Sequence, residues 1–447
     1  MFERKIYQKM LMWKRNQRVK KKALIIKGAR QIGKTTIVKK FAKENYKNVI
    51  YINFMQNETI KKVFNNDLTV DILIRGISAN IQNIRFVANE TVIIFDEIQE
   101  CANARASIKF FMEDGRFDII ATGSLLGIRG YNKKKSKGIP TGFETTLYMK
   151  SMDFEEFLWA KGVDKNVIEY LKECYYTHSK IDESINSKFF DYFNEYICVG
   201  GMPEVVNLFL RTSDMNLVRS TQRDILEEYK DDFGKHLNKD EISYVDKIEL
   251  TKILEVFESI PYQLSKENKK FQYSKIKKNG RANEYLDAIQ WLVDAGIVSM
   301  CHNLSLLESP LNGNIEDNQF KLYMQDTGLF IAMLDDDTSA NILMGNLGIY
   351  KGAIFENIIA EAFCKNGKQL FYFAKAGKFE IDFVTKINGE ITLVEVKATN
   401  GNAKSLRTVL ENYESYLVDR AIKLTKQNIG LSNKVLTIPY YLAFLVI

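Results

Sequence analysis

The sequence contains little proline, cysteine or histidine. Its 447 residues include 5 Pro, 5 Cys and 3 His. So little proline excludes a collagen-like or proline-rich chain. The cysteines are odd in number, scattered and without a CxxC pair, which argues against a disulfide framework. Because the histidines are also few and scattered, a zinc site built from His and Cys is not expected.

Signals for a membrane or for secretion are lacking as well. No apolar run reaches about 18 residues, so we expect no transmembrane helix. The first residues, MFERKIYQKM, have no apolar core of a signal peptide. Scattered free cysteines fit a reducing compartment, so we expect a cytoplasmic protein. The apolar ending YYLAFLVI is short, and we expect it to form a buried strand.

The composition is typical of a globular protein with several cores. Hydrophobic residues make up 46% and charged residues 27% of the chain, and its length suggests about three domains. Lysine and arginine number 63 against 56 aspartate and glutamate, a formal net charge of +7. This modest excess permits double-stranded DNA as a partner without requiring it.

Five apolar runs alternate with helical patterns in residues 1–150, which predicts an α/β domain. Several runs are apolar throughout, as expected of parallel strands that helices cover on both faces. The pattern favours a doubly wound parallel sheet. The expected strands are residues 23–26, 48–54, 91–95, 117–122 and 145–149.

The remaining sequence predicts three further regions. The strand signal stops near residue 151, and a helical domain is expected over residues 151–244. Within residues 245–345, an apolar helix, an Ala-Gly stop and a β-branched run follow one another, like the recognition helix and first wing strand of a winged helix. An amphipathic helix and three strands predict a small α/β domain over residues 346–447.

The clearest motif lies between the first predicted strand and a helix. It reads GARQIGKT and matches GxxxxGK[ST], the phosphate-binding loop. Its glycines let backbone N–H groups and the positive end of the helix face phosphates. Lys34 is expected to neutralise the β- and γ-phosphates of ATP, and Thr35 to bind Mg²⁺; the alternative is a chance match in a glycine turn. The expected nucleotide-binding residues are Gly28, Ala29, Arg30, Gln31, Ile32, Gly33, Lys34, Thr35 and Thr36.

Two further strands end in polar residues that fit the same site. Asp96 and Glu97 close one strand, at the edge where ligands collect in open α/β sheets. Asp96 is expected to hold Mg²⁺ and Glu97 to polarise the attacking water. Ser124 closes another strand and is expected to sense the γ-phosphate. Acids that cap a strand and ordinary turn residues are the alternatives.

With these motifs, the chain resembles prokaryotic AAA-type ATPases that carry a C-terminal domain of unknown function. The resemblance implies an ATP-binding domain over residues 1–150, a helical lid, a winged helix and a restriction-endonuclease-like tail, and it assigns Lys34, Thr35, Asp96, Glu97 and Ser124 to ATP hydrolysis. Relatives show Gly-Arg or Gly-Lys where this chain has Gly142-Phe143. An arginine finger therefore stays open between Arg116, Arg129 and a neighbouring subunit. The motifs that carry the resemblance are GARQIGKTT, IIFDEIQ, ATGSLLGI, DFEEFLWA and YICVGGMPEV.

Asn388-Gly389 predicts a hairpin between the last two predicted strands of the tail. With these two residues as the loop, Asp382 faces Glu395 and Glu380 faces Lys397. All four then share one face of the hairpin, while Ile381, Phe383, Val394 and Val396 share the other.

Together with Glu356 on the preceding helix, Asp382, Glu395 and Lys397 resemble the PD-(D/E)xK nuclease core. Opposed carboxylates destabilise a strand pair unless something compensates, and Mg²⁺ or Mn²⁺ held by Asp382 and Glu395 would do so. In that chemistry Lys397 orients or deprotonates the water. The alternative is an outer strand face with an ordinary ion pair, and a nuclease-like domain can also keep the fold without turnover.

A basic stretch lies next to the helix predicted as the recognition helix of the winged helix. Residues 263–281 carry seven cations against one acid, which suits contact with DNA phosphates or a solvated loop equally well. We therefore expect an ATP-hydrolysing, DNA-associated ATPase with a nuclease-like tail. Two alternatives stay open: a nucleotide-dependent switch or scaffold that binds DNA or protein without cutting, and a regulator with a protein ligand. A homo-oligomer is left open too.

Overall fold

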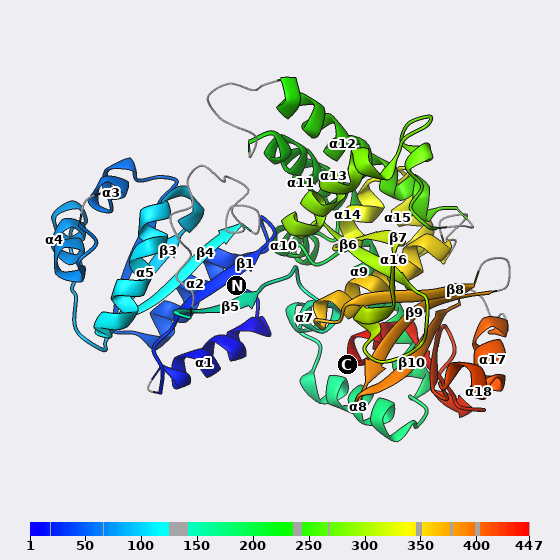
Figure 1. Ribbon diagram of the computed structural model, residues 1–447. Coiled ribbons are helices and arrows are strands. Elements are labelled where there is room, and N and C mark those ends of the chain that lie inside the picture. The colour runs from blue at the N-terminus through cyan, green and yellow to red at the C-terminus, as the bar shows by residue number, and fades with distance from the viewer. Residues whose placement is uncertain are drawn as a thin grey trace. The chain divides into compact units, whose positions relative to one another are not determined.

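The computed structural model divides into two compact units, Met1–Ser151 and Met152–Ile447 (Figure 1). None of the described helices is long and apolar enough to cross a membrane. The structure describes residues 1–17, 19–65, 67–124, 142–235, 244–266, 269–345, 351–375, 379–397 and 403–446.

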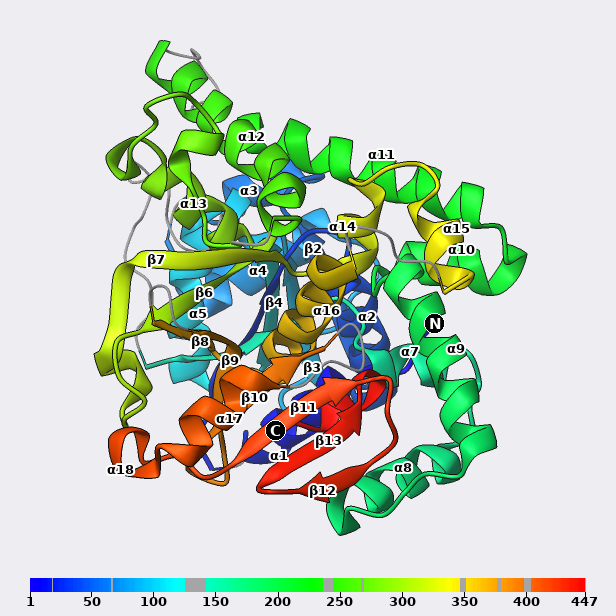
Figure 2. The same cartoon turned by 90° about the vertical axis from the view of Figure 1, so that its right-hand side faces the viewer.

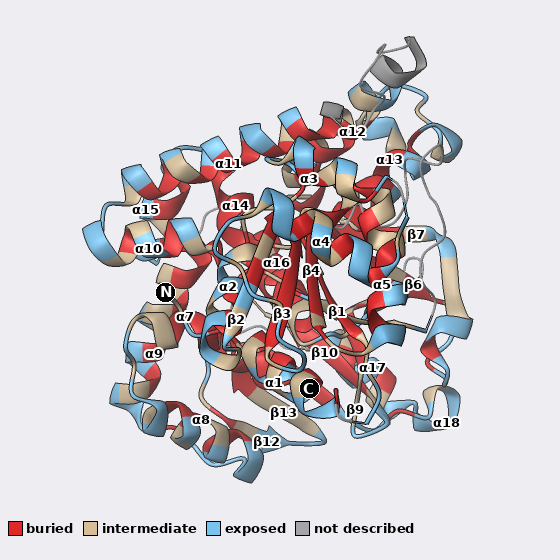
Figure 3. Ribbon diagram, turned by 90° about the vertical axis from the view of Figure 1, so that its left-hand side faces the viewer, coloured by how far each residue is buried: buried red, intermediate tan, exposed pale blue. Residues whose placement is uncertain are grey.

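The first unit is built on a five-stranded sheet whose strands are all parallel. The strand order is β2-β3-β4-β1-β5, and the five strands predicted from apolar runs are confirmed. The central strands are buried along their length (Figure 3). The strands are β1 (Ala23–Gly28), β2 (Asn48–Asn53), β3 (Thr91–Asp96), β4 (Asp118–Ser124) and β5 (Glu144–Tyr148).

Helices cover both faces of this sheet, which explains why several of its strands are apolar along most of their length. On one face, alternate residues of β1, β2, β3 and β4 share a core cluster with α3, α4 and α5. On the other face lies α2, which buries Ile37, Val38 and Phe41, with α1 beside it. The helices are α1 (Ile6–Asn16), α2 (Lys34–Asn45), α3 (Glu58–Val63), α4 (Val70–Asn80) and α5 (Ala102–Asp114).

The second unit begins with helices, as predicted. In α7, Asp153 accepts a hydrogen bond from the backbone of Glu156, and the Glu156 carboxylate accepts one in return, which forms a capping box. Helix α9 ends before Gly200, and α10 begins at Pro203. The helices are α7 (Phe154–Ala160), α8 (Lys165–Thr177), α9 (Glu183–Val199), α10 (Pro203–Thr212), α11 (Met215–Lys235), α12 (Tyr244–Leu264) and α13 (Ala282–Ala295).

An eight-stranded mixed sheet follows, in the order β12-β13-β11-β10-β9-β8-β6-β7 (Figure 2). Its strands are β6 (Val298–Leu304), β7 (Ile315–Met324), β8 (Leu370–Lys375), β9 (Phe379–Ile387), β10 (Glu390–Val396), β11 (Ala421–Thr425), β12 (Gly430–Ser432) and β13 (Val435–Pro439). The remaining helices of this unit are α14 (Thr327–Ala332), α15 (Thr338–Leu343), α16 (Lys351–Lys365), α17 (Lys404–Glu411) and α18 (Tyr413–Tyr416).

The helix and strand predicted as part of a winged helix are α13 and β6. Strand β6 pairs with β7 on one side and with β8 on the other, so residues 245–345 and 346–447 contribute to one sheet. The exposed side of α13 carries Glu284 and Asp287, and its 14 residues include no lysine or arginine. This charge does not suit a helix that contacts DNA phosphates. The winged helix and the four-part division of the chain stay predictions.

The predicted hairpin is confirmed by its turn and its register. Asn388 (φ 52°) and Gly389 (φ 85°) both have positive φ, as a type I′ turn requires. Ile387 lies opposite Glu390, and the same register continues to Phe383 opposite Val394. The predicted pairs Asp382–Glu395 and Glu380–Lys397 lie beyond this stretch and stay predictions.

The prediction that Ile381 and Phe383 share one face is wrong. The pairing of β9 with β8 shifts by one residue between Phe371 and Phe373, which is the signature of a β-bulge. Ile381 consequently joins the core cluster under α17. Phe383 packs on the other side, where its ring lies 5.6 Å from that of Phe363 on α16.

The apolar C-terminus is buried, as predicted, but it is not a strand. Residues Tyr440–Leu445 form the 3₁₀ helix η5, and all six are buried. Tyr440 stacks on Phe355 of α16 with ring centroids 4.2 Å apart. The C-terminal segment therefore packs against a helix through its aromatic side chains and does not pair with another strand.

Candidate functional site

The loop after β1 has the backbone of a phosphate-binding loop. Gly33 has a φ of 89° directly before α2, a conformation that favours glycine. A Cβ on Gly28 would lie 2.4 Å from both Ile32 Cδ1 and the backbone oxygen of Met149. Both glycines of the motif are thus required by the path of the chain, which turns tightly into the N-terminus of α2.

Lys34, the first residue of α2, is folded back over this loop. Its Nζ donates hydrogen bonds to the carbonyl oxygens of Ala29 (2.6 Å) and Gly28 (3.2 Å). The side chain is buried, and burial lowers its pKa to about 8, although the carboxylates of Glu97 and Asp96 favour the charged form. A buried ammonium group that donates to neutral carbonyl oxygens is suited to an added anion.

Asp96 gathers hydrogen-bond donors from three other elements. Thr35 on α2 donates to Oδ1 (2.9 Å) and Oδ2 (3.1 Å), and Thr122 on β4 donates to Oδ1. On β2, the Tyr51 hydroxyl donates to Oδ2 (2.5 Å), and Asn53 Nδ2 lies 3.2 Å from the same atom. The parallel register places Asn53 next to Asp96. The predicted residues Thr35 and Asp96 are therefore together at the carboxyl edge of the sheet.

Thr122, Tyr51 and Asn53 were not among the predicted site residues. Tyr51 and Asn53 are two residues apart in β2 and lie on the face opposite to Ile50 and Ile52, which belong to the core cluster. Polar residues with a period of two at the carboxyl end of a predicted strand were the signal that could have revealed them. That β2 lies beside β3 is visible only in the sheet order.

Glu97 and Ser124 lie at the same edge of the sheet. Glu97 has a φ of 53°, and its Oε2 accepts a hydrogen bond of 2.5 Å from Gln99. Ser124 is buried and pairs with Gly28, where the loop begins. Both predicted residues are thus placed around the loop.

Arg116 is not placed to act as an arginine finger in its own chain. It precedes β4, at the amino end of the strand, whereas the loop lies at the carboxyl ends. Its guanidinium group pairs with Asp71 (2.6 Å) and Asp114 (2.8 Å). Arg129 lies outside the described residues.

The residues of the first unit fit a magnesium nucleotide by their chemistry. Glycines that leave no room for a Cβ, backbone N–H groups at a helix N-terminus and the Lys34 ammonium group suit a polyphosphate. The Thr35 hydroxyl and the Asp96 carboxylate are oxygen donors of the kind that Mg²⁺ prefers.

The predicted nuclease residues lie in a second cluster of charges, in the eight-stranded sheet. Glu356 on α16 forms ion pairs with Lys269 and with Lys321 of β7 (3.4 Å), and it accepts a hydrogen bond from Tyr323 (3.0 Å). Burial disfavours the charged form of Glu356, but the two ammonium groups outweigh it and lower the pKa to about 2. Glu356 is therefore a lysine-paired carboxylate.

Lys321 joins Glu356 to Glu380 on β9, an acid outside the predicted nuclease set. Its side chain is 0% exposed, and its Nζ lies 2.6 Å from Glu380. Asp382 accepts a hydrogen bond of 2.7 Å from the backbone N–H of Val396. Burial and the charges of Glu356 and Glu395 raise the pKa of Asp382 well above its usual range.

Glu395, near the end of β10, pairs with Lys397, which directly follows the strand. Burial raises the pKa of Glu395 despite this lysine. Its other oxygen, Oε2, is buried and has no hydrogen-bond partner in the described part of the chain.

These residues do not fit a metal ion. Over the residues that the structure describes, no group of three or more His, Cys, Asp or Glu side chains could hold one. Glu356 pairs with Lys269 and Lys321, and Glu380 pairs with Lys321. The predicted nuclease residues lie close together, but lysine side chains lie among their carboxylates.

Two lysines of the basic stretch bind other side chains of the protein. Lys269 pairs with Glu356, and Lys270 donates to Gln319 (2.8 Å). Lys275, Lys277 and Lys278 are exposed. The cations that remain accessible are thus near the 3₁₀ helix η2 (Tyr273–Lys275).

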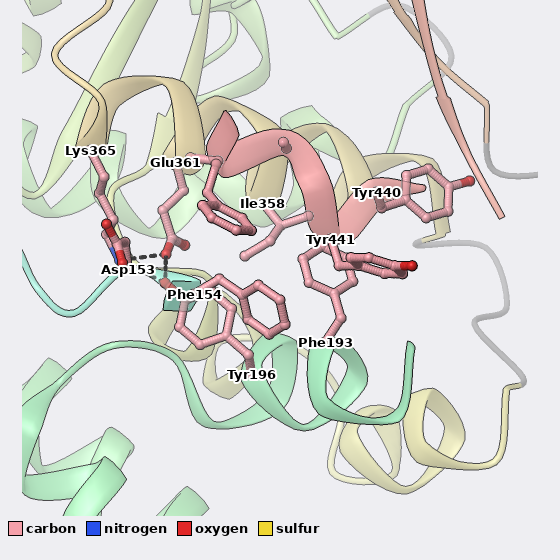
Figure 4. Close-up of a pocket in the computed structure, with 12 residues that line it drawn as sticks. Asp153, Phe154, Phe193, Tyr196, Ile358, Glu361, Lys365, Tyr440 and Tyr441 are labelled. Carbon is pink, nitrogen blue, oxygen red and sulfur yellow. Dashed lines mark hydrogen bonds and ion pairs between the residues drawn. The ribbon is translucent and has the colours of Figure 1, made fainter. Parts of the chain in front are cut away.

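A pocket of the second unit is lined mainly by aromatic residues and includes two buried carboxylates, Asp153 and Glu361 (Figure 4). Glu361 on α16 accepts hydrogen bonds from Tyr196 (2.7 Å) and Lys365 (2.5 Å), and from the backbone and hydroxyl of Thr327 (2.6 and 2.5 Å). Four donors from three helices use the acceptor capacity of this carboxylate. We therefore assign Glu361 a structural role, because its carboxylate joins α9 and α14 to α16.

Comparison with known proteins divides the chain into three matched regions. Residues 20–158 match an AAA domain, residues 190–340 match the domain of unknown function DUF8612, and residues 351–441 match the domain of unknown function DUF4143. The chain thus contains an AAA-type P-loop domain followed by two domains of unknown function. No curated protein matches the chain significantly.

Solved structures resemble the chain only distantly. The Walker-type ATPase PABY2304 of Pyrococcus abyssi is 13% identical, with a TM-score of 0.43 over 74% of this chain and 96% of that one. The RuvB Holliday junction branch migration motor of Thermotoga maritima is 13% identical, with a TM-score of 0.30 over 67% and 89%. The ORC2 protein of Aeropyrum pernix is 12% identical, with a TM-score of 0.28 over 76% and 93%. Likenesses this distant carry no functional argument.

Proposed function

We propose that the unit Met1–Ser151 binds ATP with Mg²⁺ and hydrolyses it. The observation that carries the proposal is the meeting of Lys34, Thr35 and Asp96 at the N-terminus of α2. The Thr35 and Asp96 side chains are hydrogen-bonded at 2.9 Å, and the Lys34 ammonium group is buried beside them. A buried cation and two oxygen ligands in one place are the requirements of a magnesium triphosphate.

Each residue has a role in this proposal. The loop from Gly28 to Gly33 and the first N–H groups of α2 bind the phosphates, and Lys34 turns from its carbonyl partners to the β- and γ-phosphates. Thr35 and Asp96 hold Mg²⁺, whose charge offsets that of the phosphate oxygens. Glu97 polarises the attacking water, and Ser124 contacts the γ-phosphate.

Hydrolysis by the purified full chain tests the proposal. We expect Lys34→Ala to abolish nucleotide binding. Glu97→Gln is expected to keep binding and to lower turnover by about 10²–10⁴-fold, the usual contribution of a positioned base. A wild-type chain that neither binds nor hydrolyses ATP with Mg²⁺ would refute the proposal. The mass of the chain in solution, with and without ATP, shows whether a homo-oligomer forms.

For the second unit we propose contact with DNA through exposed cations. Lys275, Lys277 and Lys278 support this proposal because they are exposed and none of them is among the lysines that pair with the buried acids. We expect duplex DNA to bind more weakly as salt rises, since bound phosphates release counterions. Reversing the three charges to glutamate should weaken binding by at least tenfold at low salt. Binding that survives the reversal would refute the contact.

Two functions are proposed for the C-terminal tail. One is a nuclease, and the other is a nucleotide-dependent switch or scaffold that does not cut DNA. The pairing of Glu356 and Glu380 with Lys269 and Lys321 favours this second candidate, because lysines stand where a metal-dependent nuclease needs a metal ion. Incubation of plasmid DNA with the protein and Mn²⁺, beside Asp382→Ala and Lys397→Ala, separates the two. Cleavage that both variants lose would restore the nuclease, with Glu356, Asp382, Glu395 and Lys397 as its residues.

A further inference from the structure

We propose that Tyr51, supported by Asn53, is a positioning residue that fixes the Asp96 carboxylate for magnesium. The proposal rests on the proposed ATP binding and names a residue outside the recognised motif. Tyr51 lies on β2, the edge strand beside β3, and its hydroxyl donates to Asp96 Oδ2 at 2.5 Å. This hydrogen bond is shorter than those that Thr35 (3.1 Å) and Asn53 (3.2 Å) donate to the same oxygen.

The donors to Asp96 divide between its two oxygens. Thr122 donates to Oδ1 only, and Thr35 lies closer to Oδ1 than to Oδ2. Tyr51 and Asn53 donate to Oδ2 only. A carboxylate rotates about a single bond unless both oxygens are held, so Tyr51 and Asn53 fix the plane that presents Oδ1 to Thr35. Hydrogen bonds to a ligating carboxylate typically change metal affinity by 10–100-fold.

Tyr51 is itself held in place from two sides. The Lys39 ammonium group of α2 lies 3.7 Å from the centroid of its ring, a cation–π contact. Asn53 Nδ2 lies 3.3 Å from its hydroxyl, while Asn53 Oδ1 accepts hydrogen bonds from the backbone of Met55 and Gln56. Both the ring and the hydroxyl are therefore oriented before any nucleotide binds. Tyr51 acts through Asp96 alone.

The same unit offers a matched control. Tyr46 also donates its hydroxyl to a strand aspartate, Asp118 Oδ2, at 2.8 Å. Asp118 begins β4 and thus lies at the amino edge of the sheet, away from the phosphate loop. Tyr46→Phe and Tyr51→Phe remove the same kind of hydrogen bond, but only Tyr51→Phe removes it from the proposed magnesium ligand.

The test measures affinity for a fluorescent ATP analogue with Mg²⁺ and with EDTA. We expect Tyr51→Phe to reduce the strengthening by Mg²⁺ about tenfold, the low end of such effects, while affinity in EDTA changes less than twofold. Asn53→Ala should do the same, and Tyr46→Phe should match the wild type in both conditions. The Mg²⁺ concentration that gives half-maximal ATP hydrolysis should rise in parallel for Tyr51→Phe.

Two results would overturn the proposal. One is a Tyr51→Phe chain with wild-type magnesium dependence. The other is an equal loss of affinity in EDTA and in Mg²⁺, which would make Tyr51 a purely structural residue. A wild type that binds no nucleotide in either condition would instead refute the proposed function itself, so the two failures are distinguishable.

Discussion

Thr35, in the first turn of α2, donates a hydrogen bond to Asp96 at the end of β3, with Oγ1 2.9 Å from Oδ1. The two residues are 61 positions apart and come from the two motifs that the sequence analysis joined to one nucleotide. Their contact arises because β1 and β3 both flank β4 in a parallel sheet. Both residues therefore offer oxygen atoms at the same edge.

Thr35→Ala removes one of the two proposed magnesium ligands. We expect nucleotide affinity in EDTA to stay within about threefold of the wild type, while its strengthening by Mg²⁺ falls at least tenfold, as for a lost metal contact. Thr35→Ser keeps the hydroxyl and should retain most of the magnesium effect. Titration with a fluorescent ATP analogue measures both. A serine variant as weak as the alanine variant would contradict the role of the hydroxyl.

Gly201 lies against the backbone of Met152 in the second unit. A Cβ at this position would lie 2.0 Å from the backbone oxygen of Met152, a contact that side-chain rotation cannot relieve. We expect Gly201→Ala to lower the free energy of unfolding by about 1–3 kcal/mol, the usual cost of overpacking. Gly430→Ala is the control, because a Cβ there meets nothing within 4 Å. Denaturant unfolding of both variants makes the comparison, and equal midpoints would contradict the close approach.

Much of the first unit could be predicted because local signals agree with the global fold. Strands buried on both faces must be apolar, and the loop motif carries its own backbone requirements at Gly28 and Gly33. Tyr51 could not be assigned from the sequence. Its role depends on β2 lying beside β3, and strand order is set by packing that no single segment encodes.

In the second unit, the alternation of side chains along a strand did not predict the face of every residue. The turn Asn388-Gly389 fixed the hairpin register correctly, yet a bulge in β9 moves Ile381 to the other face. The partners of the acids were missed for a different reason. Lys321 lies on β7, and its pairing with Glu356 and Glu380 depends on a sheet that spans two predicted domains.

We expect Lys321 to stabilise the second unit. Its side chain is fully buried between Glu356 and Glu380, so Lys321→Met leaves buried carboxylates with fewer counter-charges. We expect a loss of about 3–5 kcal/mol of unfolding free energy. Lys434→Met is the control, because its exposed pair with Asp419 is worth at most about 1 kcal/mol. If both variants unfold at the wild-type midpoint, the lysine pairing does not stabilise the unit.

The pH dependence of stability offers a test of the charge on Glu356. Lys321 and Lys269 hold its pKa at about 2, with Tyr323, Asp382 and Glu395 around it. A carboxyl group whose pKa is lower in the folded state stabilises the fold above its unfolded pKa of about 4.5. That stabilisation is lost as the pH falls through 2, because the unfolded chain takes up the proton first.

We therefore expect Glu356→Gln to lower the unfolding free energy by about 3 kcal/mol or more at pH 7. The gap between wild type and variant should shrink by about 1 kcal/mol per pH unit between pH 4.5 and pH 3. A Trp13→Phe background lets tryptophan fluorescence report this unit alone, since Trp159 and Trp291 are the two other tryptophans. A gap that is constant from pH 7 to pH 3 would mean an ordinary pKa, and one that grows on acidification would mean a raised pKa; either result would contradict the lysine-paired carboxylate.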